Sequence, residues 1–197
     1  MSGHFIVFEG LDQSGKQTQA ELLRDRIAAR DGRCELLSFP DYQTSIGAEI
    51  ARGLHGDREY GPDVMQLLYV ANRYEKKPQI EEWLRAGVSL VSDRYVASSI
   101  AYGEAQGLDP VWLTEIQRFL PTASLTIFLD IAPETAVQRK AANRDRYERD
   151  LAMLARVRES YGRQAAAPSW ARLDGSRSKD AVAADAISLV ESRLWRR

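Results

Sequence analysis

The chain has little of what stabilises a small secreted protein or anchors a membrane protein. Its 197 residues contain one cysteine, Cys34, so no disulfide can form within the chain, and this usage fits a reducing compartment. No apolar run approaches the roughly 18 residues of a membrane span. The first residues lead directly into a predicted strand and do not have the pattern of a signal peptide. We therefore expect a cytoplasmic protein with no membrane partner.

A large excess of charge of one sign is also lacking. Lys and Arg number 27 and Asp and Glu number 28, which gives a net charge near −1. Such a balance lacks the global basic field of nucleic-acid binders, so we expect no nucleic-acid partner. The two histidines, His4 and His55, have no partners at metal-ligand spacing. With 44% hydrophobic residues, the chain can bury one sizeable core, and we expect a single domain over residues 1–197.

A glycine-bounded loop near the N-terminus carries the strongest signal. Phe5 to Glu9 is typical of a short buried strand, and the apolar residues after the loop recur at helical spacing. The loop and first helical turn comprise Gly10, Asp12, Gln13, Ser14, Gly15, Lys16, Gln17 and Thr18. They match G-x-x-x-x-G-K, in which backbone N–H groups, the lysine and the helix N-terminus hold the phosphates of a nucleotide.

One residue departs from this pattern. Gln17 stands where a Ser or Thr usually offers a hydroxyl group to Mg²⁺. Thr18 is one residue late for that role. The sequence therefore indicates that a metal ion is held in another way, or partly by Thr18 from a shifted geometry.

Strands and helices alternate along the rest of the chain. Further strands are predicted at Cys34–Phe39, Val88–Ser92, Leu125–Asp130 and Trp170–Leu173. This order predicts an α/β fold of the P-loop NTPase type, with a parallel five-stranded sheet flanked by helices. Ligands of such sheets bind beyond the carboxyl ends of the strands. Phe39-Pro40 and Asp93-Arg94-Tyr95 fall at such strand ends.

A long helix is predicted to begin at Asp63, with a kink at Pro78. Its most apolar stripe consists of Val64, Leu67, Leu68 and Ala71, which we expect in the core. Tyr69 and Arg73 lie on the opposite face, one turn apart. They are either solvated, as such pairs usually are, or they face a cleft that binds a planar ligand.

An ordered set of short motifs covers nearly the whole chain. The set comprises Phe8-Glu9-Gly10 with Asp12, Phe39-Pro40, Tyr69 and Arg73 around Ala71-Asn72-Arg73, Asp93-Arg94-Tyr95 with Ser98, Ser99 and Tyr102, and Tyr147-Glu148. Each motif alone is weak, but the ordered set resembles the thymidylate kinase family of nucleoside monophosphate kinases. The resemblance implies transfer of the γ-phosphoryl group of ATP to dTMP, giving dTDP and ADP, with Mg²⁺ and in a homodimer.

The resemblance also implies roles for individual residues. Lys16 and the loop amides would hold the donor phosphates, Asp93 would position Mg²⁺ through water, and Arg94 would clamp the acceptor phosphate. The remaining acceptor contacts would be Asp12 at the deoxyribose 3′-OH, Phe39 and Pro40 as a wall, Tyr42 at the phosphate, Tyr69 stacked on thymine, Arg73 at its O4, Ser99 at the other polar edge and Tyr102 beside the sugar. Ser98 and Tyr147 would also belong to the acceptor site.

A basic segment is expected to form a small lid over about residues 139–147. Arg139 would lie against adenine. Many relatives carry an Arg in the phosphate loop, where this chain has Gln13, so the lid would supply that charge. Arg144 is the first candidate for a catalytic cation and Arg146 the second, with Arg139 and Lys140 still open.

Several alternatives remain open at this point. Asp93 and Arg94 could form a simple ion pair at a strand end, Tyr102 could be a packing residue, and the basic segment could be a solvated surface. Two other functions compete with the monophosphate kinase. One is a deoxynucleoside kinase, which would need a general base for a 5′-OH. The other, motivated by Gln17, is a nucleotide-binding protein without turnover.

Overall fold

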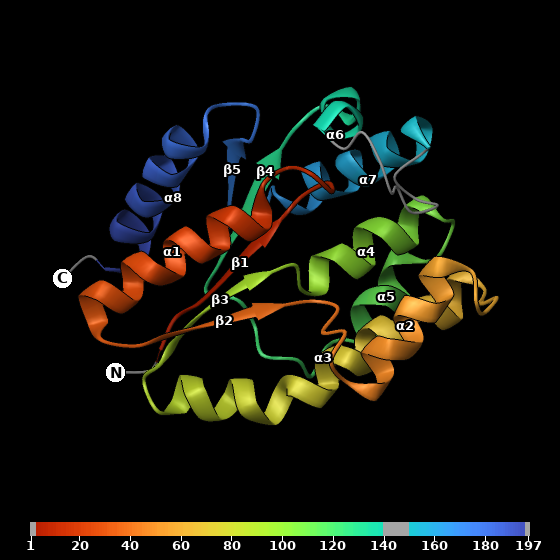
Figure 1. The fold of residues 1–197 in the computed structure, drawn as a ribbon, viewed down its shortest axis with the longest axis horizontal. Coiled ribbons are helices and arrows are strands. Elements are labelled where there is room, and N and C mark those ends of the chain that lie inside the picture. The colour runs from red at the N-terminus through yellow and green to blue at the C-terminus, as the bar shows by residue number, and fades with distance from the viewer. Residues whose placement is uncertain (1–2, 140–149, 196–197) are drawn as a thin grey trace.

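A computed structural model describes residues 3–139 and 150–195. The strands are β1 Phe5–Glu9, β2 Cys34–Ser38, β3 Ser89–Asp93, β4 Leu125–Asp130 and β5 Trp170–Asp174. The helices are α1 Lys16–Asp31, α2 Ser45–His55, α3 Pro62–Arg85, α4 Val96–Ala105, α5 Pro110–Glu115, α6 Pro133–Arg139, α7 Leu151–Gln164 and α8 Lys179–Leu194. All strands pair in parallel, in the order β2-β3-β1-β4-β5 (Figure 1). The predicted fold class is confirmed.

Helices cover both faces of this sheet. Every residue of β1 and β4 is buried, as expected for central strands of a parallel sheet. Successive residues alternate between two cores: Ile6 and Phe8 pack toward α1 and α8, whereas Phe5 and Val7 pack on the face that α3 covers. The phosphate loop therefore starts from a fully buried strand at the centre of the sheet.

The long helix α3 is where the prediction of burial was wrong. Val64 is 38% exposed and Leu67 is 47% exposed, whereas Met65 on another face is only 1% exposed. The buried residues of α3 include three polar ones, Gln66, Asn72 and Arg73. The prediction took the most hydrophobic stripe of α3 as its buried face. The face that is buried carries polar side chains, which are surrounded by residues distant in the sequence. The helix does continue through Pro78.

One of those polar residues fixes the loop that follows β2. Asn72 accepts a hydrogen bond from the Asp41 backbone N–H at 2.8 Å, and its amide nitrogen donates to Asp41 O at 3.1 Å and to Thr44 Oγ1 at 2.9 Å. Thr44 in turn caps α2 by accepting from Gly47 N. This network holds Phe39 and Pro40 against α3. The Phe39–Pro40 peptide bond is cis.

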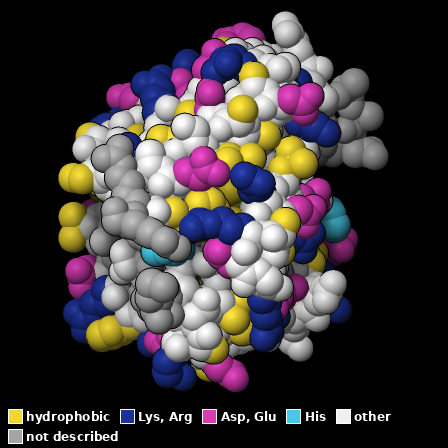
Figure 2. All heavy atoms as spheres, turned by 90° about the vertical axis from the view of Figure 1, so that its left-hand side faces the viewer, with side chains coloured by type: hydrophobic (Ala, Val, Ile, Leu, Met, Phe, Trp, Pro, Cys, Tyr) yellow, Lys and Arg dark blue, Asp and Glu magenta, His cyan; other side chains and the backbone are white. Residues whose placement is uncertain are grey.

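The surface on the side that carries both chain ends shows acidic and basic side chains interspersed (Figure 2). In the described ranges, no helix is both long enough and apolar enough to span a membrane.

Candidate active site

The phosphate loop lies between the end of β1 and the start of α1. Gly10 has φ 146°, and a Cβ atom there would come within 2.5 Å of Leu129 O, so only glycine fits. Lys16 is 5% exposed, and its Nζ donates to Leu11 O at 2.8 Å. Burial, together with the nearby charge of Arg94, lowers the pKa of Lys16. A bound phosphate would relieve this unfavourable environment.

Asp93, at the end of β3, pairs in register with Phe8 of β1 and so ends beside the loop. Its Oδ1 is buried and accepts no hydrogen bond from the residues that the structure describes. A free carboxylate oxygen beside a phosphate loop fits Mg²⁺, which is usually held by one or two carboxylates with phosphates and water. The described residues contain no cluster of three or more His, Cys, Asp or Glu that could hold a metal alone.

The other metal candidate, Thr18, is exposed in the first turn of α1. Gln17 Nε2 donates to Glu21 Oε1 at 3.0 Å along the helix surface. Ser14 Oγ, within the loop, is buried and has no partner in the described chain. Asp93 and Ser14 thus each present a buried oxygen atom that has no partner among the described residues.

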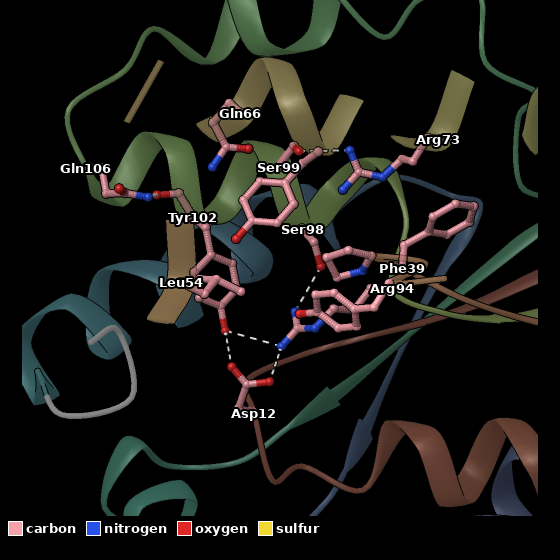
Figure 3. Close-up of a pocket in the computed structure, with 13 residues that line it drawn as sticks. Asp12, Phe39, Leu54, Gln66, Arg73, Arg94, Ser98, Ser99, Tyr102 and Gln106 are labelled. Carbon is pink, nitrogen blue, oxygen red and sulfur yellow. Dashed lines mark hydrogen bonds and ion pairs between the residues drawn. The ribbon is translucent and has the colours of Figure 1, made fainter. Parts of the chain in front are cut away.

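Arg94 stands at the junction of the loop and the neighbouring pocket. Its backbone has φ 66°, a conformation that non-glycine residues rarely adopt and that occurs at functional sites. Nη2 forms an ion pair with Asp12 Oδ1 at 2.6 Å, and Nη1 donates to Ser98 Oγ at 2.9 Å (Figure 3). Because the carboxylate that pairs with Arg94 belongs to Asp12, the simple Asp93–Arg94 ion pair is not what forms.

The Asp12 carboxylate is held ionised. Burial alone would raise the pKa of Asp12, but the charges of Arg94 and Lys16 outweigh it and keep the pKa well below its ordinary value of 3.8. Tyr102 donates to Asp12 Oδ2 at 3.1 Å (Figure 3), and burial raises the pKa of Tyr102, so the phenol stays protonated. Tyr102 therefore contacts the charged centre of the site.

The sequence predicted no separate role for Glu9, which belongs to the Phe8-Glu9-Gly10 motif. It is fully buried at the end of β1, and its Oε1 accepts from Tyr95 N at 2.8 Å and Ser98 N at 3.2 Å. Its Oε2 accepts from Ser98 Oγ at 2.6 Å and Tyr161 OH at 3.0 Å. Glu9 thus caps α4 from another element and fixes two of the three hydroxyl groups to which Arg94 donates, those of Ser98 and Tyr161.

One pocket collects the predicted acceptor residues. Its lining includes all ten of those that the structure describes: Asp12, Phe39, Pro40, Tyr42, Tyr69, Arg73, Arg94, Ser98, Ser99 and Tyr102. Leu54, Gln66 and Gln106 also line it, and the sequence reasoning had not named them. The remaining acceptor prediction, Tyr147, lies outside the described residues, as do Lys140, Arg144 and Arg146.

Arg73 lies at the inner wall of this pocket. It is 3% exposed, and Nη1 donates to Ser99 Oγ and to Gln117 Oε1, both at 2.9 Å. Burial lowers the pKa of Arg73 to about 10, so it remains a cation at neutral pH. Tyr69 and Arg73 thus face a cleft, the second of the two possibilities that the sequence left open.

Arg139, the last residue of α6, reaches toward the phosphate loop. Its Nη1 donates to Gln13 O at 3.2 Å and its Nη2 to Ser176 O at 3.5 Å. The side chain is exposed. Arg139 therefore lies beside the phosphate loop and does not line the acceptor pocket.

The fold and site together define a class of protein. A phosphate loop on a parallel sheet, next to a pocket with an arginine at its entrance and aromatic walls, is the architecture of a P-loop kinase that acts on a small planar acceptor.

Comparison with known proteins identifies the family. The thymidylate kinase family model matches residues 8–186. The thymidylate kinase of Schizosaccharomyces pombe is 36% identical over 195 residues, which cover 96% of this chain and 92% of that protein. The human thymidylate kinase is 33% identical over 195 residues, covering 98% and 92%. A solved structure of Candida albicans thymidylate kinase has a TM-score of 0.87 at 30% identity, covering 97% of this chain and 92% of that one.

The chain therefore belongs to the thymidylate kinase family, whose members transfer a phosphoryl group from ATP to dTMP.

Proposed function

We propose that this protein phosphorylates dTMP to dTDP with ATP, and that Arg94 holds the acceptor phosphate opposite the phosphate loop. The position of Arg94 carries the proposal, since it lies where the loop meets the pocket and already binds an anionic group, Asp12. Lys16 and the loop amides bind the donor phosphates, and Arg139 contacts the donor base. Phosphoryl transfer needs mainly such positioning and charge stabilisation.

Mg²⁺ would be held by Asp93 through water, together with the donor phosphates. When bound, it supplies charge neutralisation to the phosphates during transfer. The support is the unpartnered Oδ1 of Asp93 and the absence of any larger acidic cluster among the described residues. Thr18 remains a second proposed contact.

The carboxylates of the site favour a phosphate acceptor over a 5′-OH. Asp12 is paired with Arg94, and its lowered pKa makes it a weak base. Glu9 is fully buried and already accepts from two backbone N–H groups and two hydroxyl groups. A deoxynucleoside kinase would need a free base, and the free oxygen of Asp93 is assigned above to Mg²⁺. An acceptor phosphate needs instead the cation that Arg94 provides.

The acceptor nucleoside lies between α3 and α4. We place thymine on Tyr69 with its O4 at Arg73, and the deoxyribose at Tyr102 and Asp12. Phe39 and Pro40 form the wall, Ser99 lies at the polar edge, and Tyr42 reaches the acceptor phosphate. Ser98 lines the pocket beside Arg94. All these residues line the same pocket, which supports the set as one binding site.

A homodimer is the proposed assembly. Val64 and Leu67 expose an apolar stripe on α3, and a second copy of this stripe is a suitable partner for it. Leu67→Glu should shift the protein toward monomer in sedimentation measurements, and Val111→Glu, at an exposed apolar residue of α5, should not. A dimer that tolerates Leu67→Glu would place the interface elsewhere.

The remaining sequence predictions stay proposals: one domain over residues 1–197, a cytoplasmic location, and a basic lid over about residues 139–147. Arg144 and Arg146 are proposed to supply transition-state charge from that lid. If so, the Arg144→Ala, Arg146→Ala double variant should lose roughly 10³-fold or more in kcat. Retention of kcat within a few-fold would assign the charge to Lys16, Arg94 and Mg²⁺.

A panel of acceptors tests the function itself. ADP release is measured with dTMP, with thymidine and with no acceptor. The proposal requires release that depends on dTMP. Release with thymidine would instead support the deoxynucleoside kinase, and no release with any acceptor would support the binding protein.

A further inference from the structure

The acceptor pocket contains a buried amide oxygen without a partner. Gln66 lies on α3 about two turns before Arg73 and is 1% exposed, yet its Oε1 accepts no hydrogen bond within the described chain. Gln66 lines the pocket, and Figure 3 shows it on the same side as Arg73, with Ser99 between them. An unsatisfied buried carbonyl group destabilises the empty protein, so its presence calls for a ligand or another explanation.

Space for this side chain comes from a glycine on the facing helix. A Cβ atom at Gly103 of α4 would lie 3.4 Å from Gln66 Cγ and 2.6 Å from Leu113 Cδ1. Because α4 carries no side chain at this point, the Gln66 stem packs along the helix and its amide ends at the pocket. An apolar side chain could fill the same space without leaving a polar atom unpaired.

The base edge of thymine offers two acceptors, O4 and O2, with the N3–H donor between them. Arg73 has only donors and cannot pair with N3–H. The nearby oxygens of Ser99 and Gln117 already accept from Arg73 Nη1. A glutamine amide, which has one acceptor and two donors, can pair with a donor and an adjacent acceptor of a base at once.

We propose that Gln66 reads the N3–H of thymine through Oε1, while its Nε2 donates to an adjacent carbonyl group of the base. Arg73 and Gln66 then divide the recognition. Arg73 requires an acceptor at position 4, and Gln66 requires a pairing partner at position 3. Cytosine fails at Arg73, because its amino group would face the guanidinium. The inference rests on the proposed function, since it assumes thymine in this pocket.

Gln66→Leu tests the assignment, because leucine keeps the packing and removes the amide. Titration calorimetry should show dTMP binding weakened about 10-fold or more, the range for losing one good base contact. Any turnover should show this loss in KM with little change in kcat, because the contact is equal in the ground and transition states. The melting temperature should stay the same or rise. Gln79→Leu, on the exposed face of the same helix, should leave dTMP binding unchanged.

A base analogue gives a second, independent test. N3-methyl-dTMP lacks the donor and adds bulk, so the wild type should bind dTMP much more tightly than the analogue. Gln66→Ala, which vacates the space, should reduce that preference by about 10-fold.

Three results would overturn the inference. The first is unchanged dTMP binding in Gln66→Leu, and the second is an unchanged preference of Gln66→Ala for dTMP over N3-methyl-dTMP. The third is a Gln66→Leu variant that does not fold or melts at a markedly lower temperature, which would make Gln66 a structural residue. Wild-type turnover of dTMP is scored separately. Binding without turnover would refute the kinase and leave the Gln66 comparison valid.

Discussion

Replacing Arg94 by alanine is the most informative single change. The guanidinium donates to Ser98 Oγ and forms the 2.6 Å ion pair with Asp12, and its side chain is only 14% exposed. In Arg94→Ala the acceptor phosphate loses its proposed clamp, and Asp12 loses its ion-pair partner, which leaves Lys16 as the nearby cation. The variant therefore places a poorly compensated carboxylate near the position of an incoming phosphate.

The expected loss of activity is large and the loss of stability is small. One preorganised electrostatic contact is worth roughly 10²- to 10³-fold in rate, and repulsion from Asp12 adds to this, so kcat/KM should fall about 10²- to 10⁴-fold. The Asp12 side chain is 33% exposed, so solvent screens the ion pair, and the free energy of unfolding should fall by only about 1 kcal/mol.

The assay is coupled ADP release with dTMP as the varied substrate, beside a denaturation curve for each protein. Arg94→Lys is the matched control: it keeps the charge and loses the planar fork that donates to several groups at once, so it should retain more activity than Arg94→Ala and less than the wild type. Near-wild-type turnover by Arg94→Ala would refute the reasoning.

Three further changes probe other parts of the site. Tyr102→Ala should reduce the preference for dTMP over its ribonucleotide, measured as the ratio of kcat/KM values, because the phenol crowds the sugar; an unchanged ratio would make Tyr102 a packing residue only. Glu9→Ala should lower the free energy of unfolding by about 2–5 kcal/mol, because it leaves two backbone N–H groups and two hydroxyl groups without their acceptor. Glu9→Gln should lower it much less, and equal losses for the two variants in urea titrations would contradict this. Folding lowers the pKa of Asp12, so the ionised carboxylate stabilises the folded protein fully above pH 3.8, its ordinary pKa, and this stabilisation is lost as the pH falls through the folded pKa. Below pH 3.8 the melting temperature of the wild type should therefore drop more steeply than that of Asp12→Asn. Parallel curves for the two proteins would rule this out.

The fold and most of the site could be predicted because their signals are local. The phosphate loop is one short segment, and parallel strands bring their carboxyl ends to one edge, so Phe39, Asp93 and the loop had to meet. The spacing of Tyr69 and Arg73 on one helix placed both in the same cleft.

What the sequence could not show depends on partners distant along the chain. Arg73 is buried because Gln117, 44 residues later, accepts from it, and Asn72 is buried because it holds Asp41, 31 residues earlier. No periodicity reveals such pairs, so the apolar stripe of α3 was mistaken for its buried face. Glu9 left one usable signal, an acidic residue at the end of a buried strand, but its partner Tyr161 lies 152 residues away.

Transfer of the γ-phosphoryl group tests the central claim most directly. ATP labelled at the γ-phosphate is incubated with the protein, Mg²⁺ and either dTMP or thymidine, and the labelled products are separated. The account predicts labelled dTDP from dTMP and no labelled product from thymidine. Labelled dTMP from thymidine, or inorganic phosphate as the only labelled product, would contradict it.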